Sequence, residues 1–92
     1  MNIDSASIPL TCGTIDIANA RRGRYSAQMD DGEFIAFELL DSIELHPGDH
    51  ITARLSGHGG QDFLLRRDGQ KFAVFVEMIG ASRKTASAWA LA

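Results

Sequence analysis

The stretch GTIDIANARRGRYSAQMDDG, residues 13–32, decides the fold of this 92-residue chain. Within it, residues 13–19 and 24–30 alternate between apolar and polar side chains, which is the pattern of a β-strand with one buried face. Gly23 ends the short basic turn between them and can take the positive φ that such a turn needs. Asp31-Gly32 is typical of a tight hairpin. The stretch therefore predicts two strands, each followed by a turn. The side chains expected to face inward from the second strand are Tyr25, Ala27 and Met29.

Further strands are predicted along the rest of the chain, over residues 33–40, 50–55, 62–67 and 71–79. Residues 33–40 would also allow a helix, but eight residues directly after a hairpin turn favour a strand. The last strand is apolar on both faces, which is typical of a central strand covered on both sides. We expect one face to carry Phe72, Val74, Val76 and Met78, and the other Ala73, Phe75, Glu77 and Ile79.

The two ends of the chain differ from this β region. Residues 1–7 are small and polar and predict a flexible arm. Ser82 can cap a short helix over residues 83–91, where an alanine-rich composition favours helix. We expect Trp89 to dock this segment either onto the rest of the domain or onto another subunit.

Together these patterns predict an all-β fold. Short strands with regular turns are typical of a small antiparallel barrel of five to six strands. We expect a single domain over residues 1–92, with the barrel over about residues 8–80 and a C-terminal helix or tail over residues 81–92. The chain is 45% hydrophobic, which is enough for one modest core.

Composition and charge narrow the classes of function. The net charge of −3 provides no global positive field for non-specific binding of nucleic acid, although a local basic patch can still act. Cys12 is the only cysteine, so no intrachain disulfide can form, and we expect the protein in a reduced, cytoplasmic setting. We expect Cys12 itself to be a small core residue. The N-terminal residues lack the pattern of a signal peptide, and no apolar run is long enough to span a membrane. We therefore expect no membrane partner.

Residues 13–32 resemble the start of a cold-shock domain, a five-stranded barrel of the oligonucleotide-binding (OB) class. That family begins with Gly-x-Val-Lys-Trp-Phe-Asn and two variable residues, and continues with Lys-Gly-Phe-Gly-Phe-Ile and an Asp-Gly turn. The positions that agree without a gap are Gly13, Asn19, Arg22, Gly23, Asp31 and Gly32. The resemblance implies an OB-like barrel, a class that holds single strands on aromatic side chains beside a basic groove. The family's stacking aromatics are replaced here by Ile17, Ala18, Arg24 and Ser26.

Basic residues gather at two predicted turns and provide the candidate binding site. If these turns are neighbours, their side chains form a stripe that can follow phosphates, with one tyrosine as a stacking ring beside it. The candidate residues are Arg21, Arg22, Arg24, Tyr25, Arg66, Arg67 and Lys71. The alternative is a set of solvated charges balanced by the nearby residues Asp30, Asp31 and Asp68.

Other chemistry has weaker support. The one grouping that suggests a metal is His46, Asp49, His50 and His58, but these residues lie in turns and loops that fix no ligand geometry, so we expect neither metal nor cofactor. Residues 56–60 are glycine-rich but lack the helix and Lys-Ser/Thr pair of a phosphate-binding loop. No nucleophile–base pair or carboxylate dyad stands out, and we therefore expect that the protein is not an enzyme.

Two hypotheses of function follow, and both describe a binding module without chemistry of its own. In the first, the barrel binds single-stranded RNA or DNA weakly through the basic residues. In the second, it has lost that face and serves as a protein-interaction or self-association module, for example as a homodimer. The apolar residues expected to supply the second surface are Ile17, Phe34, Leu40 and Trp89.

Overall fold

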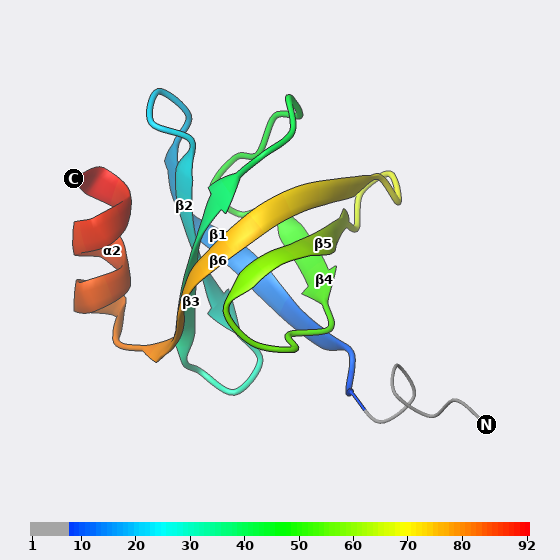
Figure 1. Ribbon diagram of the computed structural model, residues 1–92, viewed down its shortest axis with the longest axis horizontal. Helices are drawn as coiled ribbons and strands as arrows, with labels where there is room; N and C mark the ends of the chain where they lie inside the picture. Colours follow the sequence, from blue (N-terminus) through cyan, green and yellow to red (C-terminus); the bar gives the residue numbers. More distant parts are fainter. Residues whose placement is uncertain (1–7) are drawn as a thin grey trace.

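The computed structural model describes residues 8–92, in which six strands close into an antiparallel barrel with one short C-terminal helix (Figure 1). The elements are β1 (Thr11–Asn19), β2 (Arg24–Met29), β3 (Phe34–Leu39), β4 (His50–Ala53), β5 (Gly59–Leu65), β6 (Lys71–Ala81) and α2 (Arg83–Leu91). Around the barrel the order is β1-β2-β3-β6-β5-β4, and β4 pairs with β1 to close it. The predicted class, a small antiparallel barrel with a C-terminal helix, is confirmed. The flexible arm predicted for residues 1–7 lies outside the described residues.

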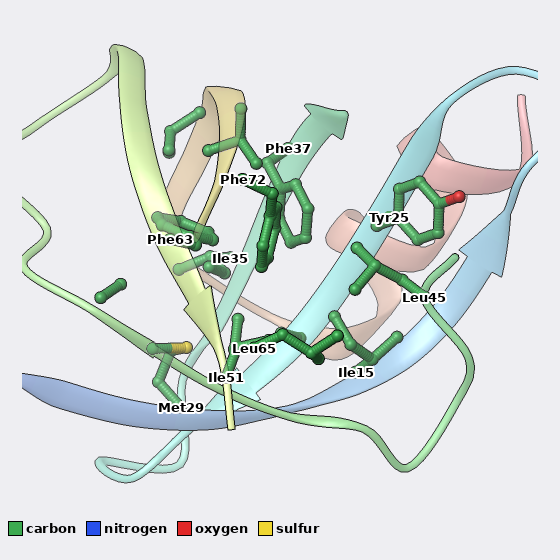
Figure 2. Packing of buried hydrophobic residues seen from close by; sticks show 14 residues of the cluster. Ile15, Tyr25, Met29, Ile35, Phe37, Leu45, Ile51, Phe63, Leu65 and Phe72 are labelled. Carbon is green, nitrogen blue, oxygen red and sulfur yellow. The ribbon is translucent and has the colours of Figure 1, made fainter. Parts of the chain in front are cut away.

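The barrel interior is filled by one hydrophobic cluster to which all six strands contribute (Figure 2). Tyr25, Ala27 and Met29 all face inward from β2, as the alternation predicts. A chain of aromatic contacts crosses the interior, because Phe37 stacks on Tyr25 and meets Phe63 edge-on, with ring centroids 5.8 and 5.2 Å apart. Each fully buried side chain of this size contributes about 1.5–3 kcal/mol, so this cluster is the main source of stability.

At two positions of residues 13–32 the backbone favours glycine, for a different reason at each. A Cβ atom at Gly13 would lie 2.5 Å from the Met29 sulfur and 3.0 Å from the Gln28 carbonyl oxygen, so any other residue here would displace Met29. Gly23 ends the β1–β2 turn with a φ of 69°, a conformation that side-chain-bearing residues rarely adopt. The resemblance to a cold-shock domain thus includes positions that this backbone requires.

The second half of β6 departs from the predicted alternation. Met78 was expected beside Val76 on the core face, but it packs on the outside of the barrel. The reason is an irregularity in the β3–β6 ladder: Phe37 pairs with Val76 whereas Ala36 pairs with Met78, which leaves one extra residue on β6. Such a bulge reverses the faces of the residues that follow it.

The outer face of β6 is also less covered than expected, because the cluster under α2 includes only Met78 and Ala81 of this strand. Phe75 remains 42% exposed, and Glu77 is exposed beside it. The prediction that both faces of this strand are covered is therefore wrong.

Two smaller expectations are also wrong. β5 begins at Gly59, three residues earlier than predicted, because Gly59 and Gly60 pair with β6 despite the low strand propensity of glycine. Cys12 is half-buried and is not a core residue, since its neighbours Gly13 and Ile15 take the inward positions of β1. Its sulfur lies 3.9 Å from Nη1 of Arg66 on the outside of the barrel.

The helix α2 has the bounds that the sequence predicts. The Ser82 hydroxyl accepts a hydrogen bond from the Thr85 N–H at 3.1 Å, which caps the first turn. Ala86 is fully buried against Phe34 and Ala36 of β3, and Trp89 packs against the same cluster. Trp89 therefore docks the helix onto the barrel of its own chain.

Candidate nucleic-acid interface

Helix α2 covers the outer face of β2 and β3 (Figure 1). This face carries Ser26 and Ala36, both fully buried. OB barrels bind oligonucleotides and oligosaccharides on the face of their second and third strands. In this chain that face lies beneath a helix, so a single strand cannot reach it while α2 is docked.

Polar contacts from β1 and β2 hold the C-terminal end of α2. Arg24 donates from Nη1 to the Trp89 carbonyl oxygen at 3.0 Å, and Asn19 donates from Nδ2 to the Ala90 carbonyl oxygen at 2.8 Å. The last carbonyls of a helix lack partners in its regular hydrogen-bond pattern. Asn19 satisfies that of Ala90, and Arg24 adds a second donor to that of Trp89, which also accepts the Ala92 N–H at 3.3 Å. The Arg24 guanidinium also lies 4.7 Å from the centroid of the Trp89 ring. Arg24, predicted as a phosphate ligand, thus serves to dock the helix.

The first residue of the helix is held by an ion pair. Arg83 donates from Nε and Nη2 to the two carboxylate oxygens of Asp16, at 2.9 and 3.0 Å. This hydrogen bond raises the pKa of Arg83, which stays charged. The Asp16 carboxylate also lies at the end of the helix where a negative charge is favourable.

Tyr25 is 2% exposed, and its ring stacks on Phe37 inside the barrel. Burial raises the pKa of its hydroxyl. The expectation that Tyr25 offers a stacking ring beside the basic residues is therefore wrong. The reason is the strand alternation, which places position 25 on the inward face.

The two basic turns lie apart, so the expected continuous stripe does not form. In Figure 1 the β1–β2 turn rises beside α2, and the β5–β6 turn lies on the opposite side of the barrel. Arg21 and Arg22 are exposed in the first of these turns, and their side chains make no hydrogen bond or ion pair within residues 8–92.

Arg67 has a structural partner. Its Nη1 donates to Asp49 at 2.6 Å and its Nη2 to the Glu44 carbonyl oxygen at 3.1 Å, which ties the β5–β6 turn to the connection before β4. Burial alone would raise the pKa of Asp49. Hydrogen bonds from the His46 N–H and from Arg67, together with the charge of Arg67, outweigh burial and hold this pKa below its usual value.

Arg66 and Lys71 are both exposed, and Lys71 pairs with Leu64, two residues before Arg66. Two residues that the sequence did not single out for this site lie in one row with Arg66. His50 pairs with Thr14 across β4 and β1, and its Nδ1 lies 3.2 Å from the threonine hydroxyl. Arg66 continues this row, since its N–H donates to the His50 carbonyl oxygen at 2.9 Å. We call Thr14, His50, Arg66 and Lys71 the basic face.

The basic face borders a shallow hollow of about 410 Å³, and the residues that line it are Gly48, Asp49, His50, Arg66 and Arg67. Lys71 lies on the other side of the hairpin, at the start of β6. Thr14 and His50 stand on the polar side of their strands. The β1–β4 register pairs them with each other and the β4–β5 register places Arg66 beside His50, and no sequence pattern gives these registers.

The histidines and acidic residues do not converge on one point. Within residues 8–92, no group of three or more His, Cys, Asp or Glu side chains is placed to hold a metal ion. His46 lies 3.8 Å from a carboxylate oxygen of Glu44, whereas His50 contacts Thr14. The side chains of these two histidines therefore contact different partners.

Comparisons with protein-family models, curated proteins and solved structures found no match for the chain. The candidate site therefore rests on the geometry described above. Among the described residues, no helix has the length and hydropathy needed to cross a membrane.

Proposed function

We propose that the protein is a non-enzymatic, cytoplasmic binding module that contacts the backbone of single-stranded RNA or DNA weakly through the basic face. The observation that carries this proposal is the position of Arg66, which stands exposed in one row with His50 and Thr14, with its guanidinium 3.9 Å from the Cys12 sulfur. Guanidinium, imidazole and hydroxyl groups are all donors to phosphate oxygens.

This proposal differs from the binding mode of a cold-shock domain. Backbone contacts position a strand without reading its sequence, and base stacking needs exposed aromatic rings. Tyr25 is inside the barrel, and the face of β2 and β3 is covered by α2. We therefore expect little sequence preference. The OB-like assignment is part of the same proposal and is supported by the closed antiparallel barrel, by the close approach of Met29 at Gly13 and by the positive φ of Gly23.

A titration of a fluorescently labelled oligonucleotide at two salt concentrations tests the proposal. Each phosphate contact to a single strand contributes a slope of about −0.7 to the plot of log affinity against log salt. Two contacts, from Arg66 and Lys71, predict a slope of about −1.4 and about a sevenfold loss of affinity between 50 and 200 mM salt. Absence of binding at high micromolar protein in low salt would contradict the proposal.

A second candidate function, protein interaction or self-association, is favoured by apolar side chains on the outside of β3 and β6. Leu40 and Phe75 are 55% and 42% exposed. The Leu40 N–H donates to the carbonyl oxygen of Ala73, which is two residues before Phe75 on β6. Of the residues first assigned to this surface, Phe34 and Trp89 are instead occupied by the packing of α2. Light scattering over a range of protein concentrations tests this candidate, which predicts a concentration-dependent rise in mass that Phe75→Ser abolishes.

A further inference from the structure

The open end of the barrel next to the β2–β3 turn holds a pocket that neither proposed function uses. Its cavity volume is about 220 Å³. Met29 and Ile35 of the core form its inner part, and Leu55 and Ile79 form its sides. Figure 2 shows Met29 at one end of the core cluster and Tyr25 at the other.

Ile79 gives this pocket its open side. The side chain is 38% exposed although its neighbours Met29 and Ile35 are buried. It follows the bulge in β6, which turns it toward the barrel end instead of the outer surface. Together with Met29, Ile35 and Leu55 it gives the pocket an apolar lining that is open to solvent and can receive another apolar group.

The rim of the pocket is acidic. Asp30, Asp31 and Glu33 line it from the β2–β3 turn, and all three residues are exposed. No Lys, Arg or His is among the residues that line the pocket. The rim therefore repels phosphate and attracts a cation, whereas the inner part excludes charge and attracts hydrocarbon.

We propose that this pocket binds a lysine side chain presented by a partner protein. A lysine side chain combines the two properties that the pocket requires, since its four methylene groups can lie along apolar surface while the ammonium group stays at the edge in contact with water and with carboxylates. The cavity is smaller than the roughly 300–1,000 Å³ of small-molecule sites, and this size suits one side chain better than a whole ligand.

This site is independent of the basic face. The two surfaces lie on different parts of the barrel, share no residue and attract opposite charges. A protein that does not bind oligonucleotide therefore does not contradict the lysine site, and a protein that does not bind the lysine peptide does not contradict the nucleic-acid proposal.

The test is a titration of the full-length, ¹⁵N-labelled protein with a blocked Gly-Lys-Gly peptide, followed by amide NMR shifts. The control peptide replaces lysine by norleucine, which keeps the methylene chain and removes the charge. At low salt we expect shifts grouped at Met29, Leu55 and Ile79, with the lysine peptide bound at least about threefold more tightly, an effect of the size expected for exposed ion pairs. The preference for lysine should disappear in 0.5 M salt.

A charge variant and a matched control complete the experiment. Asp30→Asn/Asp31→Asn should bring the affinity for the lysine peptide down to that for norleucine, whereas Asp62→Asn, an exposed carboxylate away from the pocket, should leave it unchanged. Three results would each overturn the proposal: equal affinities for both peptides in the unmodified protein, shifts grouped elsewhere, or no shifts at about 10 mM peptide, a concentration that detects millimolar dissociation constants.

Discussion

The guanidinium of Arg24 donates a hydrogen bond to the main-chain oxygen of Trp89 at 3.0 Å and lies over the ring of the same residue at 4.7 Å from its centroid. These two residues are 65 positions apart in the chain. Their contact joins β2 to the last turn of α2 and keeps the helix on the face of β2 and β3. It therefore decides which part of the barrel surface is open to a ligand.

Arg24→Ala is expected to destabilise the protein by about 1–2 kcal/mol, because it removes a charge-assisted hydrogen bond and a cation–π contact. Trp89 is the only tryptophan, so its fluorescence reports directly on the docking of α2. Urea unfolding followed by this fluorescence measures the loss. Arg24→Lys keeps the charge but not the planar guanidinium, so its stability should lie between those of the unmodified protein and Arg24→Ala. An Arg24→Ala variant with unchanged midpoint and emission would show that the contact does not hold the helix.

Ser82→Ala is expected to cost about 1 kcal/mol, because the hydroxyl that caps the first turn of α2 is lost. The helical signal in circular dichroism should fall together with a shift in Trp89 emission. Ser87→Ala, a change within the same helix that removes no cap, is the matched control and should be neutral or slightly stabilising. Equal effects of the two changes would exclude capping as the cause.

Gly13→Ala is expected to destabilise the barrel by about 1–3 kcal/mol through overpacking against Met29 and the Gln28 carbonyl group. Gly60→Ala provides a matched comparison, because a Cβ atom there meets nothing within 4 Å and its φ is not positive. That change should be neutral or stabilising, since it reduces the freedom of the unfolded chain. Thermal unfolding of the two variants gives the comparison, and equal losses would contradict the close approach of β1 to Met29.

The lowered pKa of Asp49 predicts that the protein loses stability at acid pH. Its pKa in the folded protein lies below the ordinary value of 3.8, so the ionised form is favoured by folding. The contribution is therefore present above pH 3.8 and is lost as the pH falls through the folded-state pKa. Unfolding free energies at pH 7 and near pH 3 should differ less in Asp49→Asn than in the unmodified protein. An equal difference in both proteins would show that the pair with Arg67 has no net effect.

The sequence predicts those parts of the fold that depend on neighbouring residues. The strands β1 and β2, the Asp31-Gly32 turn and the helix after Ser82 follow from alternation, turn chemistry and capping. These signals act within a few residues, and the structure agrees with them. The same alternation already placed Tyr25 inside the barrel.

The rest depends on contacts between residues far apart in the chain. The bulge that moves Met78 outward arises from the ladder between β3 and β6, and the row formed by Thr14, His50 and Arg66 arises from strand register. Neither leaves a local pattern. The six basic candidates looked equivalent as a sequence, but α2 engages Arg24 and Asp49 engages Arg67. Only the packing of the chain separates these residues from Arg66 and Lys71.

The measurement that tests the central claim most directly is the salt dependence of oligonucleotide binding in two double variants. If the basic face binds the backbone, Arg66→Ala/Lys71→Ala should weaken binding at low salt and reduce the magnitude of the log–log salt slope by about 1.4, the value for two phosphate contacts. Arg21→Ala/Arg22→Ala, which removes the same charge from the other turn, should leave affinity and slope unchanged. A lower slope in the Arg21/Arg22 variant with an unchanged slope in the Arg66/Lys71 variant would contradict the account.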